Sequence, residues 1–268
     1  MNTANSGRWA VWLSFPLAVL LAVACLGGLV DASVYARESR LLAAQGIGGD
    51  AGNLLITTPL LVLTAWLALR GSLVARLVWM GVLVDLIYNY LYCALALPFN
   101  ALFPLYCGVL ALSSWALAGG LPSLAADDVA SRAAPRAPVK TVAVVLLLMS
   151  LGTAAHWMQE IVPAAIGRRV PQSVIDSGLL SAPVAALDLA FMMPASVIAA
   201  VLLWRRKSAG FVLGPVLLTF LALGSLVLAV MGVAMARGGI EAGRALVAIG
   251  AGIAAVAGWL LWRMLPRS

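Results

Sequence analysis

Seven long stretches without a charged residue dominate the chain and limit what it can fold into. They are residues 9–30, 51–69, 86–126, 141–159, 189–204, 208–236 and 245–262. A helix of about 20 mostly apolar residues crosses the roughly 30 Å of hydrocarbon in a bilayer. Inside lipid every backbone polar group must be bonded within the protein, and the alternation of a β-barrel is absent, so helices are the structure that these stretches can form.

Composition places the chain among membrane proteins. Hydrophobic residues make up 63% of it, charged residues only 10%, and the mean hydropathy is +1.05. A soluble domain carries about 25% charged residues. The stretch 86–126 is too long for one span and divides at Pro98, which lacks an N–H donor and disfavours helix in the residue before it. We therefore expect an all-α integral membrane protein with about eight transmembrane helices. The expected helices are 9–30, 53–69, 77–96, 101–119, 141–160, 184–204, 210–236 and 245–262.

Several classes of function are disfavoured by the residues. The net charge is +7, but the basic residues flank the apolar stretches as topology signals do, so nucleic acid is not expected as a partner. The three cysteines (Cys25, Cys93 and Cys107) form neither a CxxC pair nor a zinc pattern. A single histidine excludes bis-histidine haem and three-histidine zinc sites, and no HExxH, GxSxG or P-loop motif is present. We expect no metal and no cofactor. The first apolar stretch continues past Cys25 to Val30, which favours an uncleaved helix over a signal peptide.

The distribution of lysine and arginine predicts the orientation. With the N-terminus inside, 11 basic residues fall on the cytoplasmic side and six on the other. The eleven are Arg8, Arg70, Arg76, Arg132, Arg136, Lys140, Arg205, Arg206, Lys207, Arg263 and Arg267. The prediction is a multi-pass protein of the bacterial inner membrane with both termini in the cytoplasm.

The chain divides into two similar halves. Residues 1–120 and 140–268 each hold four helices, and the polar segment 121–139 is expected to link them in the cytoplasm. A shift of 135 residues superposes Pro59 on Pro194. An even number of helices in each half would make the repeats parallel, related by an axis along the membrane normal.

Small residues recur every four positions on the last helix, at Gly250, Ala254 and Gly258. They allow another helix to approach closely, either in the same chain or in a second copy, so a homo-oligomer is one expectation.

Polar residues inside the spans are the candidates for function, because a charge at the bilayer centre costs about 2.5–3.5 kcal/mol on insertion scales. Asp85 lies well inside the third helix, and Tyr88, Asn89 and Tyr92 follow at i+3, i+4 and i+7, on one face. Asp188 lies in the outer part of the sixth helix.

A second polar face is predicted at the outer end of the fifth helix. His156 and Glu160 are four residues apart there, and with the first group they predict an acidic cavity open to the extracytoplasmic side. Structural alternatives stay open for several residues, and Tyr88, Tyr90 and Tyr92 could be interfacial anchors. Asp50 and Asp188 could cap the outer starts of helices, and Glu160 could lie among headgroups beside Trp157.

Segments in both halves resemble a group of bacterial multi-pass inner-membrane proteins to which no activity is assigned. The similar segments are 34–37, 45–53, 70–72, 88–106, 157–164 and 188–194. The resemblance implies a shared eight-helix fold and carries over no functional residue.

Three kinds of function fit these patterns. The first is binding or transport of a small solute, a cation or a lipid-like molecule at Asp85, Tyr88, Asn89, Tyr92, His156, Glu160 and Asp188. The second is a membrane-embedded enzyme acting on a lipid or isoprenoid, with Asp85 or Glu160 as acid or base. The third is a non-catalytic assembly or sensor subunit. The near-absence of polar residues from the last two helices counts against an alternating-access carrier.

Overall fold

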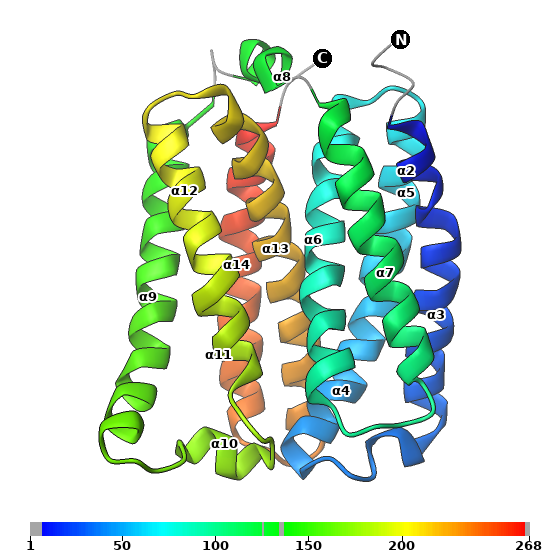
Figure 1. Ribbon diagram of the computed structural model, residues 1–268, viewed down its shortest axis with the longest axis vertical. Coiled ribbons are helices and arrows are strands. Elements are labelled where there is room, and N and C mark those ends of the chain that lie inside the picture. Colours follow the sequence, from blue (N-terminus) through cyan, green and yellow to red (C-terminus); the bar gives the residue numbers. More distant parts are fainter. Residues whose placement is uncertain (1–6, 125, 134–136, 266–268) are drawn as a thin grey trace.

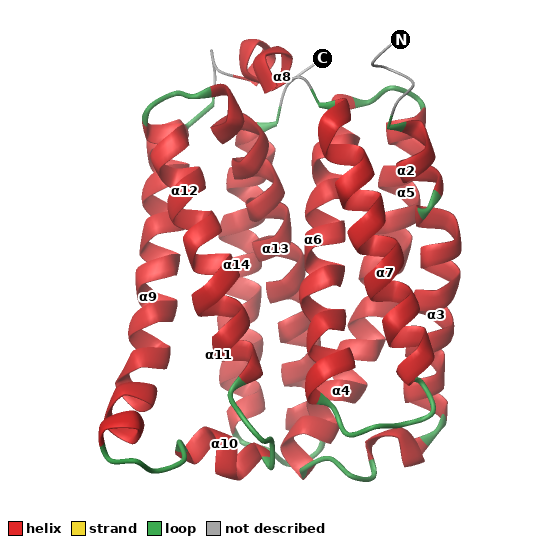
Figure 2. Ribbon diagram, in the orientation of Figure 1, coloured by secondary structure: helices red, strands yellow, loops and turns green. Residues whose placement is uncertain are grey.

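Eight helices that are long and apolar enough to cross a membrane run side by side along the long axis of the molecule (Figure 1). The computed structural model describes residues 7–124, 126–133 and 137–265, and these residues form helices, turns and loops without a strand (Figure 2). The spans are Arg8–Val30, Arg40–Leu69, Leu73–Ala96, Phe103–Gly120, Val139–Ile166, Pro183–Trp204, Ser208–Arg237 and Ala242–Met264. The prediction of an all-α, multi-pass membrane protein is confirmed.

Five spans are single helices and three are segmented. The single helices are α6 (Leu73–Ala96), α7 (Phe103–Gly120), α9 (Val139–Ile166), α13 (Ser208–Arg237) and α14 (Ala242–Met264). The first span consists of α2 (Arg8–Trp12) and α3 (Ser14–Val30). The second consists of α4 (Arg40–Gly52), η2 (Asn53–Thr57) and α5 (Thr58–Leu69), and the sixth of α11 (Pro183–Leu187), η4 (Asp188–Met192) and α12 (Met193–Trp204).

The segments η2 and η4 are π-helical, and each precedes a proline at the start of the next α-helix. Pro59 and Pro194 lack the N–H that would continue the α-helical ladder, and in a regular α-helix each ring would clash with the carbonyl four residues earlier. A wider π turn accommodates that conflict without ending the span. Such turns are frequent at functional sites.

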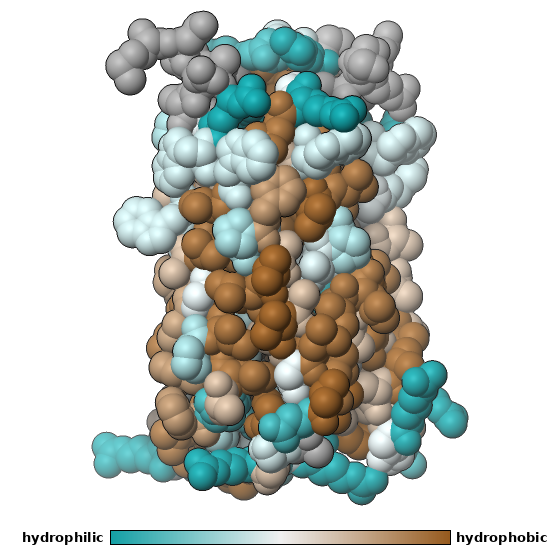
Figure 3. All heavy atoms as spheres, turned by 90° about the vertical axis from the view of Figure 1, so that its right-hand side faces the viewer, coloured by the Kyte–Doolittle hydropathy of each residue, from teal (hydrophilic) through white to brown (hydrophobic). Residues whose placement is uncertain are grey.

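Four short elements lie at the two ends of the bundle. They are η1 (Ala32–Tyr35), η3 (Leu121–Ser123), α8 (Ala126–Ala133) and α10 (Gln172–Ser177). We call one end the α8 end, where α2 begins and α14 finishes, and the other the α10 end (Figure 1). Between them, a band of apolar atoms covers the face formed around α3 and α7, with hydrophilic residues gathered at both ends (Figure 3). Such a band is what lipid contact requires.

The second span begins 13 residues earlier than predicted, at Arg40 instead of 53. Ser39 caps α4 by accepting a hydrogen bond from the Leu42 N–H at 3.3 Å. The glycines in α4 lower its helix propensity, but they also allow close packing. A Cβ atom on Gly48 would collide with the backbone of Met231 in α13, and one on Gly52 would lie 3.0 Å from Val227. Tertiary packing therefore makes helical a segment whose sequence indicated a loop.

The predicted linker 121–139 contains a helix, α8, that packs against one end of the bundle (Figure 1). Val129 is completely buried in the apolar cluster that includes Leu77 and Phe211. Arg136 and Arg267, which were assigned to the cytoplasmic side, lie outside the described residues.

Densely packed side chains fill the half of the bundle toward the α8 end. Trp79 in α6 is fully buried, and its indole N–H donates to Ser14 Oγ at 2.7 Å. In the second apolar cluster, α13 contributes the buried Phe211 and Leu218. A Cβ on Gly81 would collide with Thr219, so α6 and α13 are in close contact at this level.

The small residues of α14 do not share one environment. A Cβ on Gly250 would lie 2.6 Å from the carbonyl oxygen of Ser225, so Gly250 packs against α13 of the same chain. Ala254 is partly exposed, and a Cβ on Gly258 would meet nothing within 4 Å. A homo-oligomer through this helix stays a prediction.

Candidate functional site

A cavity of about 560 Å³ lies between the first four spans and the last four. Its walls come from α4, α6, α11, η4 and α13, and residues of α10 and of the connection to α11 also line it. The lining residues of α6 and α13 belong to the later part of each helix, at 85–93 and 220–231. Both helices begin at the α8 end, so the cavity is displaced toward the α10 end.

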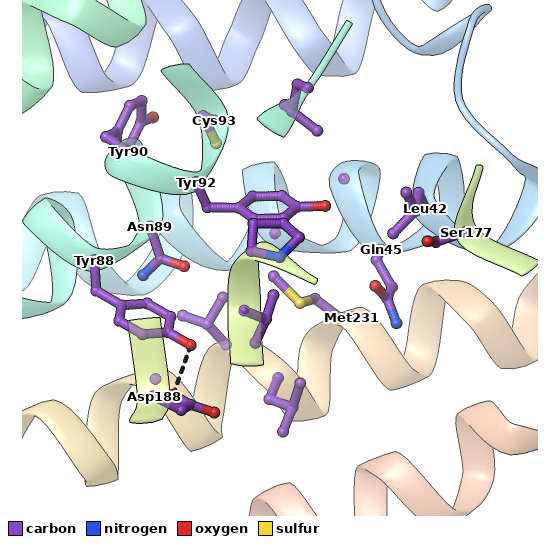
Figure 4. Close-up of a pocket in the computed structure, with 18 of the residues that line it drawn as sticks. Leu42, Gln45, Tyr88, Asn89, Tyr90, Tyr92, Cys93, Ser177, Asp188 and Met231 are labelled. Carbon is purple, nitrogen blue, oxygen red and sulfur yellow. Dashed lines mark hydrogen bonds between the residues drawn. The ribbon is translucent and has the colours of Figure 1, made fainter. Parts of the chain in front are cut away.

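Five of the seven predicted site residues line this cavity. They are Asp85, Tyr88, Asn89, Tyr92 and Asp188. The first four reach it together because they share one face of α6, whereas Asp188 comes from the sixth span. Figure 4 shows the Tyr88 side chain directed at Asp188.

Asp188 joins three elements through its carboxylate. The Tyr88 hydroxyl donates to Oδ1 at 2.9 Å, and the Trp157 indole N–H of α9 donates to Oδ2 at 2.9 Å. The interpretation of Asp188 as a helix cap is wrong, because α11 begins five residues earlier, at Pro183. Trp157 also lines the cavity. The sequence did not indicate this role, because Trp157 was expected to lie among headgroups.

Asp85 is the most unusual residue of the wall. It is 0% exposed, and neither carboxylate oxygen has a hydrogen-bond partner in the described part of the chain. The Asn89 amide donates instead to the backbone carbonyl of Asp85, at 2.8 Å. On the facing helix, a Cβ at Gly224 would lie 3.0 Å from Asp85 Oδ1, so the missing side chain there leaves room for the carboxyl group.

A third carboxyl group, Asp50, reaches the cavity from α4. Its Oδ2 accepts a hydrogen bond from the Tyr35 hydroxyl at 2.6 Å. The interpretation of Asp50 as a helix cap is wrong, because α4 begins at Arg40 and Asp50 lies near its end. Close by, Cys25 and Tyr90 form a buried contact, with 3.8 Å between Sγ and the hydroxyl oxygen.

The structure does not bring His156 and Glu160 to the cavity. His156 is exposed and packs beside Trp157, with 4.9 Å between the ring centroids. Glu160 Oε1 accepts the backbone N–H of Ser173 at 2.7 Å. Because the first turn of a helix has N–H groups without intrahelical partners, Glu160 satisfies one of them and ties α10 to α9. The hydrogen bond of Glu160 therefore has a structural role, holding α10 against α9.

The cavity wall carries acidic side chains without basic ones. Asp50, Asp85 and Asp188 line it, no Lys, Arg or His does, and none of the three pairs with a basic side chain within the described residues. Outside the spans, burial raises the pKa of Glu38, which lies just before α4. The site thus combines carboxyl groups with a mostly apolar surface that also holds amide and hydroxyl side chains.

In the ranges that the structure describes, no three His, Cys, Asp or Glu side chains lie close enough together to hold a metal ion. Comparison with known proteins returns no match to a family model, a curated protein or a solved structure. The cavity itself is therefore the basis for the functional argument.

Proposed function

We propose that this multi-pass membrane protein binds a small solute or cation in the cavity between its halves, reached from the extracytoplasmic side of a bacterial inner membrane. Asp85 carries the proposal. A buried carboxyl group without a partner is costly, and native proteins rarely keep one without a role. Here that group is part of a cavity wall. In a membrane span, an ionisable residue of this kind is a functional candidate by default.

The charge distribution supports the orientation. Nine described Lys and Arg residues lie at or beyond the α8 ends of the spans, whereas six lie at the α10 ends. The positive-inside rule then assigns the α8 end, with both termini, to the cytoplasm. The cavity accordingly belongs to the outer half of the membrane.

Matching features in the two halves support an internal repeat. Asn53 and Asp188 each begin a π-helical segment, and they are 135 residues apart. The helices α6 and α13 begin at Leu73 and Ser208, with the same separation. The turns before them also correspond, because Gly71 and Arg206 both have positive φ, at 91° and 53°.

Such repeats favour a binding site at their interface. Parallel repeats are related by an axis along the membrane normal, and in transporters of this construction substrates bind between the repeats. Asn53 and Asp188 line the cavity from opposite halves. This geometry favours solute binding over the other two functions.

The alternatives receive less support. Catalysis by a pair of acid and base groups needs them within hydrogen-bond reach of one another or of a shared substrate. The cavity carboxyl groups are not hydrogen-bonded to each other, and His156 faces elsewhere. A purely scaffolding subunit would have its polar groups satisfied, unlike Asp85. Transport would additionally require α6 and α13 to separate in the half toward the α8 end, where Gly81 and Thr219 bring the two helices into close contact.

Access to the cavity tests this proposal. In a variant whose three cysteines are replaced by alanine, single cysteines are introduced at Asn89 and Ser177 on the wall and, as a control, at the exposed Ser131 of α8. A membrane-impermeant methanethiosulfonate is added to spheroplasts. We expect Asn89→Cys and Ser177→Cys to react, and Ser131→Cys to react only after permeabilisation. Failure of both wall positions to react in permeabilised membranes would overturn the proposal, and reaction of Ser131→Cys alone in intact spheroplasts would reverse the orientation.

A further inference from the structure

The three acidic residues that line the cavity come from three different elements. Asp50 is in α4, Asp85 in α6 and Asp188 in η4. Ionised carboxylates in a low-dielectric site are expensive unless a positive charge compensates them. The wall supplies none. A cationic ligand would provide the missing charge, whereas an anion would be repelled.

The wall does not resemble the site of an inorganic cation. A hard metal ion gathers six or more oxygen ligands at close range. Here the carboxyl groups do not converge into a set of three ligands. Most of the remaining wall is apolar, with Leu42, Leu179, Val184, Leu228 and Met231. Such a surface suits a ligand that carries hydrocarbon groups beside its charge.

Aromatic rings surround the carboxylate of Asp188. Its two donors, Tyr88 and Trp157, both line the cavity, and Phe220 meets Tyr88 edge to face with 5.4 Å between the ring centroids. Tyr92 extends the aromatic surface along α6 (Figure 4). Aromatic faces attract quaternary ammonium groups, and each Asp188 oxygen retains acceptor capacity beyond its single hydrogen bond.

We infer that the cavity takes an amphiphilic organic cation, an ammonium group with apolar substituents. Asp188 and its aromatic neighbours contact the charged group. Asp85, which lies in α6 three residues before Tyr88, provides a second carboxyl group. Aliphatic side chains of α4, α11 and α13 receive the hydrocarbon part. The inference rests on the proposed function and adds the chemical class of the ligand.

Three matched compounds test the class. Benzyltrimethylammonium is the cation, neopentylbenzene its neutral carbon isostere, and benzylsulfonate the anion. Each is titrated calorimetrically into the full chain in lipid nanodiscs, with empty nanodiscs as the reference for partitioning into lipid. We expect the cation to bind at least about tenfold more tightly than either of the others.

Variants locate the charge recognition. Asp188→Asn should weaken binding of the cation by about tenfold or more and leave binding of the neutral isostere unchanged. Asp85→Asn should also weaken binding of the cation, and it breaks no hydrogen bond of the carboxylate. The test therefore does not depend on how well Asp188→Asn folds. Asp176→Asn is the matched control, because Asp176 lies exposed on α10 outside the wall. It should change neither affinity.

The outcomes separate this inference from the proposed function. Equal binding of all three compounds, or preference for the neutral or anionic one, overturns the cationic class while the cavity remains a binding site. No binding of the cation, with Asn89→Cys still reactive, also overturns the class alone. If neither Asn89→Cys nor Ser177→Cys reacts, both the cationic class and the proposed function are overturned.

Discussion

The hydroxyl of Tyr88 donates to the carboxylate of Asp188 at 2.9 Å, across 100 positions of sequence. The bond links α6 of the first half to η4 of the second, beside the cavity. The Trp157 indole adds α9 to the same carboxylate. Asp188 is therefore both a wall residue and a contact that holds three spans together.

The first prediction concerns the strength of this contact. Hydrogen bonds between membrane helices average about 0.6 kcal/mol and reach about 1.7 kcal/mol in double-mutant cycles. We expect a coupling free energy in the upper part of that range for Tyr88→Phe with Asp188→Ala, which removes the acceptor, because the acceptor is a carboxylate. Reversible unfolding of the two single variants and the double variant measures it. Additive effects would show that the bond contributes nothing to stability.

The second prediction concerns Asp85, whose carboxyl group has no partner in the described residues. Replacement of a buried, unsatisfied polar group by an apolar one of similar volume removes its desolvation cost. We expect Asp85→Leu to raise the free energy of unfolding by about 1–4 kcal/mol while abolishing cation binding. A gain in stability with a loss of function is typical of residues kept for function. Destabilisation by Asp85→Leu would mean that the carboxyl group has a structural partner.

The fold was largely predictable from the sequence, because lipid imposes one solution on long apolar stretches. The shared face of Asp85, Tyr88, Asn89 and Tyr92 was also predictable, since it depends only on the period of one helix. Which other helix faces that side was not. The positions of Asp188 and Trp157 at the cavity depend on packing between spans, which the spacing of residues within one helix does not indicate.

The interpretations of Asp50 and Glu160 were wrong because each residue's environment depends on contacts with another part of the chain. Asp50 follows a glycine-rich segment that indicates a loop by propensity, and so it resembled a cap. The same glycines pack α4 tightly against α13, which makes the segment helical and places Asp50 on the wall. Glu160 resembled a member of the polar cluster because it is acidic and close to His156. Its actual partner, the Ser173 N–H, belongs to a short helix that the sequence pattern did not indicate.

The third prediction tests the glycine packing between the halves. Gly48→Ala would force a Cβ into the backbone of Met231, which cannot give way as a flexible side chain can. We expect a loss of about 1–3 kcal/mol in the free energy of unfolding. Gly252→Ala is the control, because a Cβ there meets nothing within 4 Å and alanine favours helix. It should be neutral or stabilising in the same unfolding measurement. Similar losses for both variants would contradict the packing argument.

The last prediction concerns α10, which lines the α10 end of the cavity and is tied to α9 by Glu160. Replacing the carboxylate by an amide weakens a charge-assisted hydrogen bond to the Ser173 N–H, and replacing it by alanine removes the acceptor. We expect backbone hydrogen exchange in residues 172–177 to rise in the order wild type, Glu160→Gln, Glu160→Ala, while α6 and α13 keep their protection. His156→Ala is the control, because its exposed ring makes no contact with α10 among those that the structure gives. If α10 opens more readily, the Ser177→Cys thiol should also react faster with the impermeant reagent. Unchanged exchange in Glu160→Ala would show that other contacts hold α10 over the cavity.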